Sequence, residues 1–267
     1  MSSQPFRPEL LSPAGSLKNM RYAFAYGADA VYAGQPRYSL RVRNNEFDHA
    51  NLAQGIREAH VLDKRFYVVV NIAPHNAKLK TFLDDLQPVI DMAPDALIMS
   101  DPGLIMLVRG RYPQMPIHLS VQANAVNWAS VAFWQGQGLE RVILSRELSL
   151  GEIEEIRTQV PDMELEVFVH GALCMAYSGR CLLSGYLNRR DANQGACTNA
   201  CRWQYDVKAA GENELGEIVR MVEPTLGIGA PSEQVFVLED GEQQMPVFED
   251  EHGTYIMNSK DLRAVEH

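Results

Sequence analysis

Four cysteines within a stretch of 28 residues are the strongest chemical signal in this sequence. They are Cys174, Cys181, Cys197 and Cys201. Four thiolates in one local segment can saturate either a zinc ion or a 4Fe–4S cluster. Structural zinc sites usually contain Cys-x2-Cys pairs, and the sequence has none, so the spacing favours the cluster and leaves zinc as the alternative. Buried free cysteines are a third interpretation, which the clustering disfavours.

A glutamate and a histidine precede these cysteines on an expected strand. Glu166 and His170 share one face of that strand, because side chains repeat every two residues. His170 could act as a base, bind a substrate or support the metal site, or it could simply be hydrogen-bonded at a strand end. Glu166 faces the interior, where a carboxylate must be paired, so it is either structural beside an arginine or functional. We take both as candidate catalytic residues.

Polar residues also follow two other expected strands. Gln122 and Asn124 alternate in a loop and could offer amides to oxygen and nitrogen edges of a substrate, nucleobases included, or could cap a turn. Arg146 stands beside Glu147 and could hold a carboxylate or close a salt bridge. Position at a strand end favours a functional interpretation for Arg146.

Three arginines gather in a long loop after the second expected strand. They are Arg37, Arg41 and Arg43, and they stand close to Tyr38. Mixtures of arginine and aromatic side chains suit phosphate contacts and base stacking. A run of charges is more often a solvated face, but a second set of arginines surrounds the cysteines. We therefore take these residues as candidate substrate ligands.

Seven short apolar runs alternate with longer amphipathic stretches over the first 170 residues. The expected strands are 8–11, 30–33, 66–72, 96–100, 117–121, 141–144 and 165–169. The expected helices are 17–26, 51–62, 79–92, 103–111, 129–137 and 149–159, with Ser16 and Gly27 capping the first. Continuous apolar strands alternating with helices indicate a parallel sheet buried on both faces. The expected fold is α/β, a TIM-type (β/α) barrel rather than an open doubly wound sheet.

Only seven strands are countable, so we expect an incomplete barrel of about seven βα units that occupies residues 1–170. A cysteine-rich insertion would follow at 171–258, with a small antiparallel excursion of strands at 203–209, 235–238, 246–249 and 255–257. Residues 259–267 resemble the start of a barrel helix that is cut short after two turns. The sequence therefore predicts either a fragment that lacks its eighth unit or a sheet with one edge left open.

Composition limits the classes of function. The chain has 267 residues, 46% of them hydrophobic, and a net charge of −10, which argues against a protein that coats nucleic acid through a general basic field. No apolar run approaches the length of a membrane span, and the opening MSSQPFRP lacks the apolar core of a signal peptide, so a cytoplasmic protein is expected. The common motifs of zinc proteases, serine hydrolases, P-loop proteins and dinucleotide-binding proteins are missing.

Several segments resemble the collagenase-like peptidase family U32. The resemblance rests on EVFVHGALC at 166–174, GRCLLS at 179–184, ELLSPAGSLKN, GADAVYAG, HLSVQANAVN and DEHGTYIMNSKDL. The segments YSLRVRNNEF, YVVVNIAPHNAKL, LIMSDPGLIM and NQGACTNACRW are most similar to family members that hydroxylate tRNA. The resemblance runs from about residue 8 to the last residue.

This resemblance implies a function that spacing alone does not. It implies prephenate-dependent hydroxylation of wobble uridine in tRNA to 5-hydroxyuridine, the first step toward 5-carboxymethoxyuridine. The partners would be tRNA and the co-substrate prephenate, and the ligands of a 4Fe–4S cluster would be Cys174, Cys181, Cys197 and Cys201. By position alone, Arg41, Arg43 and Arg146 could meet the carboxylates of prephenate. The alternatives are a collagenase-like peptidase and a non-catalytic metal-binding scaffold.

Overall fold

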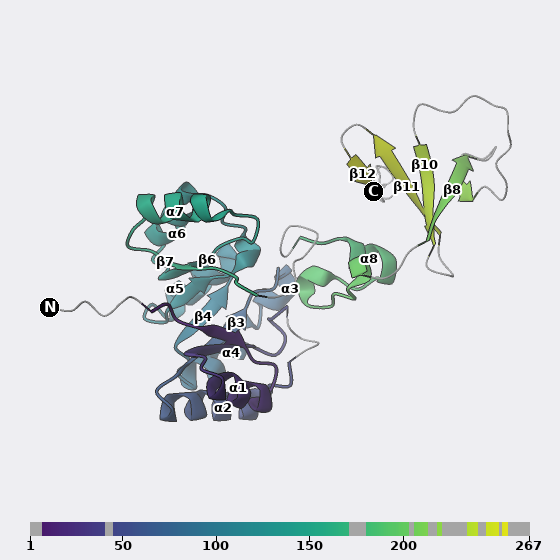
Figure 1. Ribbon diagram of the computed structural model, residues 1–267. Helices are drawn as coiled ribbons and strands as arrows, with labels where there is room; N and C mark the ends of the chain where they lie inside the picture. Colours follow the sequence, from purple (N-terminus) through teal and green to yellow (C-terminus); the bar gives the residue numbers. More distant parts are fainter. Residues whose placement is uncertain are drawn as a thin grey trace. The chain divides into compact units, whose positions relative to one another are not determined.

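The computed structural model describes residues 7–40, 45–170 and 180–202, and beyond them the backbone of five strands. The chain divides into two compact units, residues 1–200 and 201–267, which we describe separately. Figure 1 labels the elements of both units. Some of the predictions fall outside the described residues: those for Arg41 and Arg43, the one for Cys174, and the helix expected at 259–267.

The first unit is built on one parallel sheet of seven strands. The strands are β1 (Leu11–Pro13), β2 (Ala30–Gly34), β3 (Arg65–Val70), β4 (Ala96–Met99), β5 (Ile117–Leu119), β6 (Arg141–Ile143) and β7 (Glu164–Glu166). They pair in the order of the sequence, from β1 to β7. An open doubly wound sheet would reverse its strand order, so sequential order identifies the curled TIM-type arrangement. The predicted fold class is confirmed: an incomplete barrel of seven strands.

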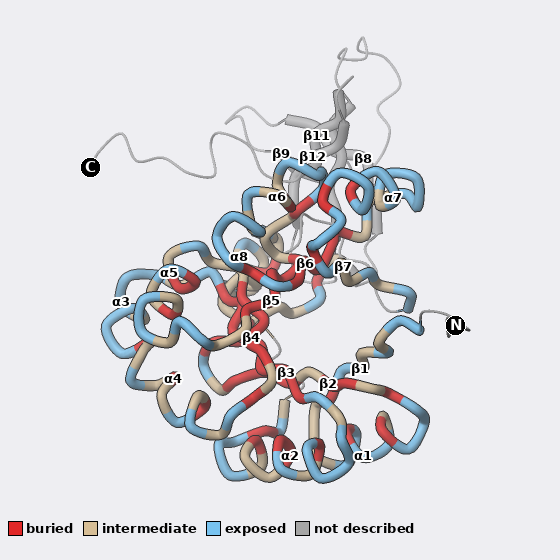
Figure 2. Tube along the Cα trace, turned by 90° about the vertical axis from the view of Figure 1, so that its left-hand side faces the viewer, coloured by how far each residue is buried: buried red, intermediate tan, exposed pale blue. Residues whose placement is uncertain are grey.

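Helices connect these strands and lie along the outside of the curl (Figure 2). They are α1 (Leu17–Ala25), α2 (His49–Val61), α3 (Asn76–Leu79), α4 (Phe82–Asp91), α5 (Pro102–Arg111), α6 (Trp128–Gly136) and α7 (Leu150–Gln159). A further helix, α8 (Leu183–Asn188), follows the last strand of the sheet. Short 3-10 turns are η2 (Val121–Ala123), η3 (Ala192–Gln194) and η4 (Ala200–Arg202). No helix among the described residues has the length and apolar character needed to cross a membrane.

The strands bury both faces, which explains their continuous apolar sequences. The outer face packs against the helices through residues that include Val31, Val68, Leu97 and Val142. The inner face forms a smaller apolar cluster that includes Tyr67, Val69, Ile98 and Ile143. Alternate residues of one strand therefore point to the helices and to the interior of the curl, where polar residues must find partners.

Local chemistry sets the helix boundaries. The Ser16 hydroxyl accepts a hydrogen bond from the backbone of Asn19 at 3.2 Å, and Gly27 follows the first helix with φ +98°, so both predicted caps are confirmed. The helix predicted at 79–92 corresponds to α4, which begins three residues later than predicted, because Thr81 precedes it as the N-cap and donates its hydroxyl to Asp85 at 2.8 Å, while a separate short helix, α3, ends at Leu79. The first strand is Leu11–Pro13 rather than 8–11, which frees Glu9 for contacts inside the curl.

The second unit contains an antiparallel sheet, as the sequence predicted after the cysteines. Its strands are β8 (Asp206–Glu212), β9 (Ile218–Arg220), β10 (Gln234–Glu239), β11 (Gln244–Asp250) and β12 (Gly253–Tyr255). They pair in the order β12-β11-β10-β8-β9. The segment 180–200, which carries two of the cysteines, belongs to the first unit.

Candidate functional site

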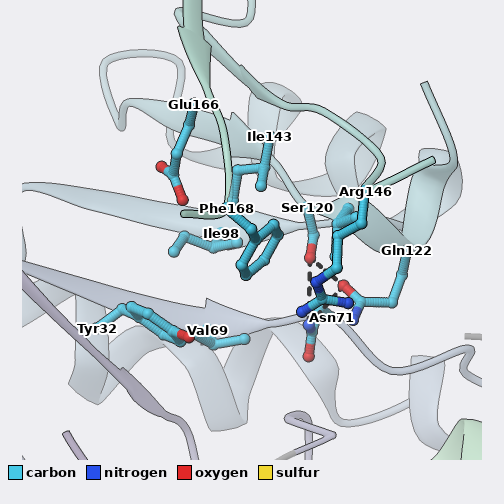
Figure 3. Close-up of a pocket in the computed structure, with 11 residues that line it drawn as sticks. Tyr32, Val69, Asn71, Ile98, Ser120, Gln122, Ile143, Arg146, Glu166 and Phe168 are labelled. Carbon is cyan, nitrogen blue, oxygen red and sulfur yellow. Dashed lines mark hydrogen bonds between the residues drawn. The ribbon is translucent and has the colours of Figure 1, made fainter. Parts of the chain in front are cut away.

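A small pocket lies where the parallel strands of the first unit end. Its walls are Tyr32, Val69, Asn71, Ile98, Ser120, Val121, Gln122, Ile143, Arg146, Glu166 and Phe168, and it encloses about 80 Å³ (Figure 3). Asn71 and Ser120 directly follow β3 and β5, and Arg146 follows β6. This is the C-terminal face of the sheet, where barrel enzymes build their active sites.

One wall of the pocket is a hydrogen-bonded group of polar side chains. The backbone N–H of Leu40 donates to Asn71 Oδ1 at 3.1 Å. Asn71 Nδ2 donates to Gln122 Oε1 at 2.9 Å and to Ser120 Oγ at 3.2 Å, and the Ser120 hydroxyl also donates to Gln122 Oε1. These bonds hold the Gln122 side chain in one orientation.

Arg146 is held in the pocket by an aromatic ring. Its guanidinium carbon lies 3.9 Å from the centre of the Phe168 ring, a cation–π contact. Among the described residues, Arg146 has no ion pair, and the salt bridge to Glu147 considered from the sequence is not formed. A half-buried cation without a carboxylate partner is suited to bind an anion.

Glu166 lies at the floor of the same pocket. Burial raises the pKa of this carboxyl to about 7, although the Arg141 guanidinium, with Nη1 at 3.6 Å from Glu166 Oε2, acts in the opposite direction. At neutral pH the carboxyl is therefore divided between its protonated and ionised forms. Such a group can donate or accept a proton near physiological pH.

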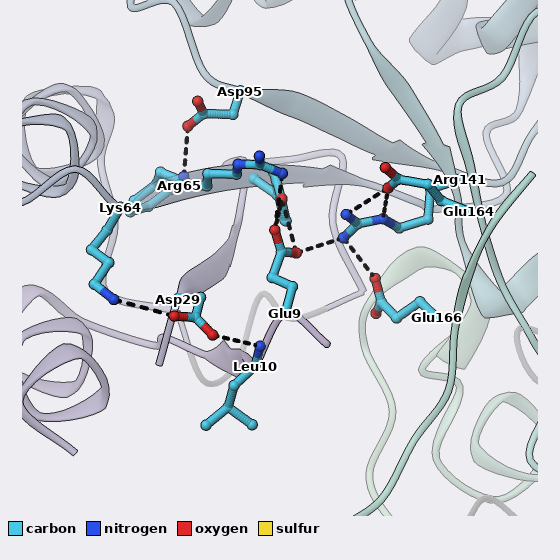
Figure 4. Close-up of polar contacts among 11 residues, drawn as sticks. Glu9, Leu10, Asp29, Lys64, Arg65, Asp95, Arg141, Glu164 and Glu166 are labelled. Atoms are coloured by element: carbon cyan, nitrogen blue, oxygen red, sulfur yellow. Dashed lines mark hydrogen bonds and ion pairs between the residues drawn. The ribbon is translucent and has the colours of Figure 1, made fainter. Parts of the chain in front are cut away.

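Beneath the pocket, toward the N-terminal ends of the strands, lies a network of charges (Figure 4). Arg141 is buried and donates to Glu9 at 2.7 Å and to Glu164 at 2.8 Å. Glu9 also accepts from Arg65 at 3.0 Å and from the Tyr67 hydroxyl at 2.9 Å. Glu9 precedes β1, so this network links the start of the sheet to β3 and β6 across the interior.

His118, on β5, lies in this lower layer rather than in the pocket. Burial, together with the positive charges of Arg141 and Arg65, lowers the pKa of His118 to about 3. The ring meets Tyr67 edge-on, with 4.7 Å between centroids. His118 is thus a neutral core residue at physiological pH.

The structure places three of the predicted site residues in the pocket and three elsewhere. Gln122, Arg146 and Glu166 line it. Arg37 pairs with Asp85 at 2.8 Å on the surface, while Asn124 adopts a left-handed conformation and donates to the Gln122 carbonyl at 2.9 Å. His170 is exposed after the end of β7 and does not line the pocket, because the strand geometry that would align it with Glu166 ends at Glu166.

The described cysteines Cys181, Cys197 and Cys201 are free thiols of intermediate exposure. Asn193 holds Cys181 through both backbone groups, at 3.1 and 3.2 Å. The backbone N–H of Asn199 points at Cys197 Sγ at 3.3 Å, a contact that stabilises thiolate sulfur. Within the described part of the chain no three His, Cys, Asp or Glu side chains gather as a metal site, and Cys174 lies outside that part.

The segment that carries these cysteines is tied to the loop after β3. The Ala73 backbone N–H donates to the Asn193 carbonyl at 3.0 Å, and the Gln194 side chain donates to the Ala73 carbonyl. Because β3 leads through Asn71 into this loop, the cysteine segment is attached close in sequence to one wall of the pocket.

Sequence analysis did not select Asn71, Ser120 or Phe168 as site residues. Asn71 offers a recognisable signal, since it is an amide in the otherwise apolar and aromatic run 66–72 and falls at the end of a strand. Ser120 similarly ends the apolar run of β5. Phe168 carries no such signal, because an apolar residue near a strand end is most often core.

Comparisons with known proteins identify relatives of this chain. It is 74% identical to tRNA hydroxylation protein P of Escherichia coli (strain K12), over 98% of this chain and 60% of that protein. It is 35% identical to the 23S rRNA 5-hydroxycytidine synthase of the same organism, over 78% of this chain and 31% of that enzyme. The chain thus spans about 60% of the length of the first of these relatives.

The fold and the family are also shared. The solved structure of the U32 peptidase Mk0906 matches with a TM-score of 0.52 at 13% identity, covering 62% of this chain and 70% of that one, a likeness that concerns the fold alone. The model of Peptidase family U32 matches residues 15–267. Together with the resemblance of the segments around the cysteines, this match shows that the chain belongs to peptidase family U32.

Proposed function

We propose that this chain is the barrel-bearing part of a tRNA-hydroxylating enzyme. Its reaction is prephenate-dependent hydroxylation of wobble uridine to 5-hydroxyuridine, and its substrate is tRNA. The observation that carries the proposal is the high identity to tRNA hydroxylation protein P along nearly the whole chain. A second relative is named for forming 5-hydroxycytidine in 23S rRNA, which supports hydroxylation of a pyrimidine in RNA as the shared chemistry.

In this proposal Cys174, Cys181, Cys197 and Cys201 hold a 4Fe–4S cluster. The donor set fits, because sulfur is the ligand that such clusters require and because Cys197 already accepts a backbone N–H at its sulfur. A bound cluster would supply one-electron redox chemistry. Zinc is the alternative metal for the same four thiolates.

The pocket residues have the chemistry to bind and to move a proton. Arg146 and Gln122 offer hydrogen-bond donors, Phe168 offers a flat apolar surface, and Glu166 titrates near neutrality. C5 hydroxylation replaces a ring hydrogen, so a group that accepts a proton near pH 7 is useful at this face. Glu166 is the described residue of the pocket that best meets this need.

The family name raises peptidase activity as the other candidate, and the pocket does not favour it. A serine nucleophile needs an adjacent base to accept its proton. Ser120 donates instead to the amide oxygen of Gln122, and the buried His118 is neutral and lies in the lower layer. Among the described residues, the pocket thus offers no activated nucleophile.

Nucleoside mass spectrometry of tRNA tests the proposal. Cells that lack this protein and any redundant pathway would be complemented with the wild type, with Cys181→Ala or with Cys197→Ala. We expect wild type to restore 5-hydroxyuridine-derived wobble nucleosides and both variants to fail. The matched control is Met106→Ala, which removes an exposed sulfur on α5 and should restore them fully.

Iron and acid-labile sulfide in protein purified without oxygen give an independent measurement. Wild type should contain both, and Cys181→Ala should lose them. Zinc in place of iron would replace the cluster assignment with the zinc alternative. Normal wobble nucleosides in the cysteine variants would refute the hydroxylation proposal as formulated.

A further inference from the structure

The donor and acceptor atoms of the pocket wall can be assigned one by one, starting from the backbone N–H of Leu40. A backbone N–H can only donate, so the Asn71 atom that Leu40 N–H meets must be the amide oxygen. Asn71 therefore directs its Nδ2 group at Gln122 and Ser120, and it has no second orientation that satisfies Leu40. Both Nδ2 hydrogens are used in these two contacts.

The same logic fixes Gln122. Its side-chain atom beside Asn71 Nδ2 must be an acceptor, which is Oε1, and the Ser120 hydroxyl donates to this same oxygen. The amide oxygen is therefore occupied by two donors. Gln122 Nε2, which has no partner among the described residues, is left as a pair of N–H donors on a residue that lines the pocket.

Arg146 adds further donors and a positive charge to this wall. Its guanidinium stacks on Phe168 and has no carboxylate partner in the described part of the chain. The remaining walls are largely apolar, through Val69, Ile98 and Ile143, and the one carboxyl of the lining, that of Glu166, is uncharged when it is protonated. A ligand that suits such a pocket presents only acceptors, carries negative charge and has an apolar body beside the charged group.

We propose that the pocket binds the carboxylate group of a small organic acid, held by Arg146 and by Gln122 Nε2, and that Asn71 is the positioning residue that makes Gln122 a donor. This inference rests on the proposed function in one respect, since it places the organic acid of that reaction here. The pocket, of about 80 Å³, admits a carboxylate and its neighbouring carbons.

A uracil base fits this wall less well than a carboxylate does. Uracil presents two carbonyl acceptors separated by an N–H donor, and that N–H needs an acceptor. On this wall Gln122 Oε1 already accepts from two donors and Asn71 Oδ1 accepts from Leu40, while the Glu166 carboxyl lies on the floor of the pocket rather than on this wall. A carboxylate has no donor to satisfy and can accept from Arg146 and Gln122 together.

Calorimetric titration of the purified chain tests the binding site. The probes are prephenate, phenylacetate, its neutral counterpart phenylacetamide, and uridine. We expect both carboxylates to bind, phenylacetamide to bind at least about tenfold more weakly than phenylacetate, and uridine not to compete. Arg146→Gln and Gln122→Met should each weaken phenylacetate by about tenfold or more, while Arg111→Gln on the exposed end of α5 should not.

The variant Asn71→Asp tests the positioning role. The new carboxylate accepts rather than donates, so Gln122 must turn its Nε2 toward it and present Oε1 to the pocket. Phenylacetate should then bind at least about tenfold more weakly, and phenylacetamide should bind more tightly than it does to wild type. A general loss of structure or an added negative charge would not strengthen phenylacetamide. Asn127→Asp, at the N-cap of α6, adds the same charge outside the pocket as a control.

Three results would overturn the inference. They are no heat from prephenate and phenylacetate at about 10 mM, equal affinity for phenylacetate and phenylacetamide, and binding of uridine that depends on Gln122. Circular dichroism of each variant verifies that it is folded. The binding assay contains no tRNA, so it is independent of the test of the proposed function. If the chain binds carboxylates but a deletion strain has unchanged tRNA, only the proposed function is refuted. If the deletion strain loses the modified nucleosides but the chain binds no carboxylate, only this inference is refuted.

Discussion

Two arginines five residues apart show how differently the two ends of the sheet treat charge. Arg141, in β6 near the N-terminal ends of the strands, is buried and faces the carboxylates of Glu9, Glu164 and Glu166. Arg146, beyond the C-terminal end of the same strand, faces an aromatic ring and no carboxylate among the described residues. The two side chains have the same chemistry and opposite surroundings.

The surroundings of Arg141 suit a role in the folded structure, and those of Arg146 suit a role in binding. A buried cation surrounded by carboxylates cannot lose them without a large cost to the folded state, and its hydrogen-bond donors are already used. A cation without a partner contributes little to folding and remains available to an anion. Barrel folds generally keep function at the C-terminal face and stability at the other, and this chain follows that division through the surroundings of its arginines.

Exchanging each arginine for methionine should give the largest difference in stability between the two positions. Arg141→Met leaves the buried carboxyl of Glu166 and that of Glu9 without their shared cation, so we expect the free energy of unfolding at pH 7 to fall by about 3–5 kcal/mol. Arg146→Met should change it by less than about 1 kcal/mol. Urea unfolding followed by circular dichroism measures both. Equal effects of the two substitutions would show that Arg146 has a structural partner.

The pH dependence of the free energy of unfolding tests whether the carboxyl of Glu166 is buried as the structure places it. The pKa of its carboxyl is raised from 4.5 to about 7 in the folded state, so the folded protein holds a proton that the unfolded chain releases. Glu166 therefore stabilises the fold below pH 4.5, and this contribution is lost as the pH rises toward 7. Glu166→Gln should gain stability relative to wild type across this window, on the order of 3 kcal/mol.

Unfolding at several pH values between 4.5 and 8, for both proteins, gives this difference. His118 acts with the opposite sign, because its lowered pKa makes the fold lose stability as the pH falls below 6.5, but it is present in both proteins and cancels. Glu155→Gln, on the exposed face of α7, is the matched control and should follow wild type. A variant curve parallel to wild type would contradict the assigned burial of Glu166.

Removal of one hydroxyl tests the lower network with a smaller effect. Tyr67→Phe removes the donor that both oxygens of Glu9 accept, at 3.0 and 2.9 Å, and we expect a loss of about 1–2 kcal/mol in the free energy of unfolding. Tyr26→Phe, in which the ring is almost fully exposed, should lose nothing measurable. Indistinguishable unfolding midpoints for the two variants would mean that the Tyr67 hydroxyl is satisfied equally well by water.

The smallest expected effect concerns the ring beneath Arg146. Phe168→Leu keeps an apolar wall but removes the cation–π contact, so affinity for phenylacetate should fall by about two- to fivefold. Phe133→Leu, on the exposed face of α6, is the control for calorimetry. If Phe168→Leu binds phenylacetate as tightly as wild type does, the Phe168 ring does not position Arg146 for binding.

The fold was accessible from the sequence because it depends on repeated patterns. Seven apolar runs separated by amphipathic stretches predicted the sequential parallel sheet, and the segments around the cysteines predicted the family. For Glu166 the sequence left two interpretations open, a structural carboxylate beside an arginine or a functional one, and in the structure Arg141 lies 3.6 Å from it while it also lines the pocket. The roles assigned to the cysteines remain predictions.

The details of the site were less accessible because they depend on contacts between distant residues. Asn71 is positioned by Leu40, and its partner Gln122 comes from a loop about 50 residues later, a pairing that no local pattern reveals. Arg37 carries the same charge as Arg146 and occupies a similar place in the sequence pattern. It is neutralised by Asp85 because α4 happens to place that carboxylate beside it.

The contact between Glu9 and Arg141 has a consequence for how the protein folds. These residues are 132 positions apart, so the entropy of closing the chain between them opposes their ion pair until the intervening strands are ordered. We therefore expect this contact to form late in folding, after the strands have paired. Weakening it should therefore accelerate unfolding while leaving the refolding rate almost unchanged. Glu9 would then act as a latch that governs the lifetime of the native state.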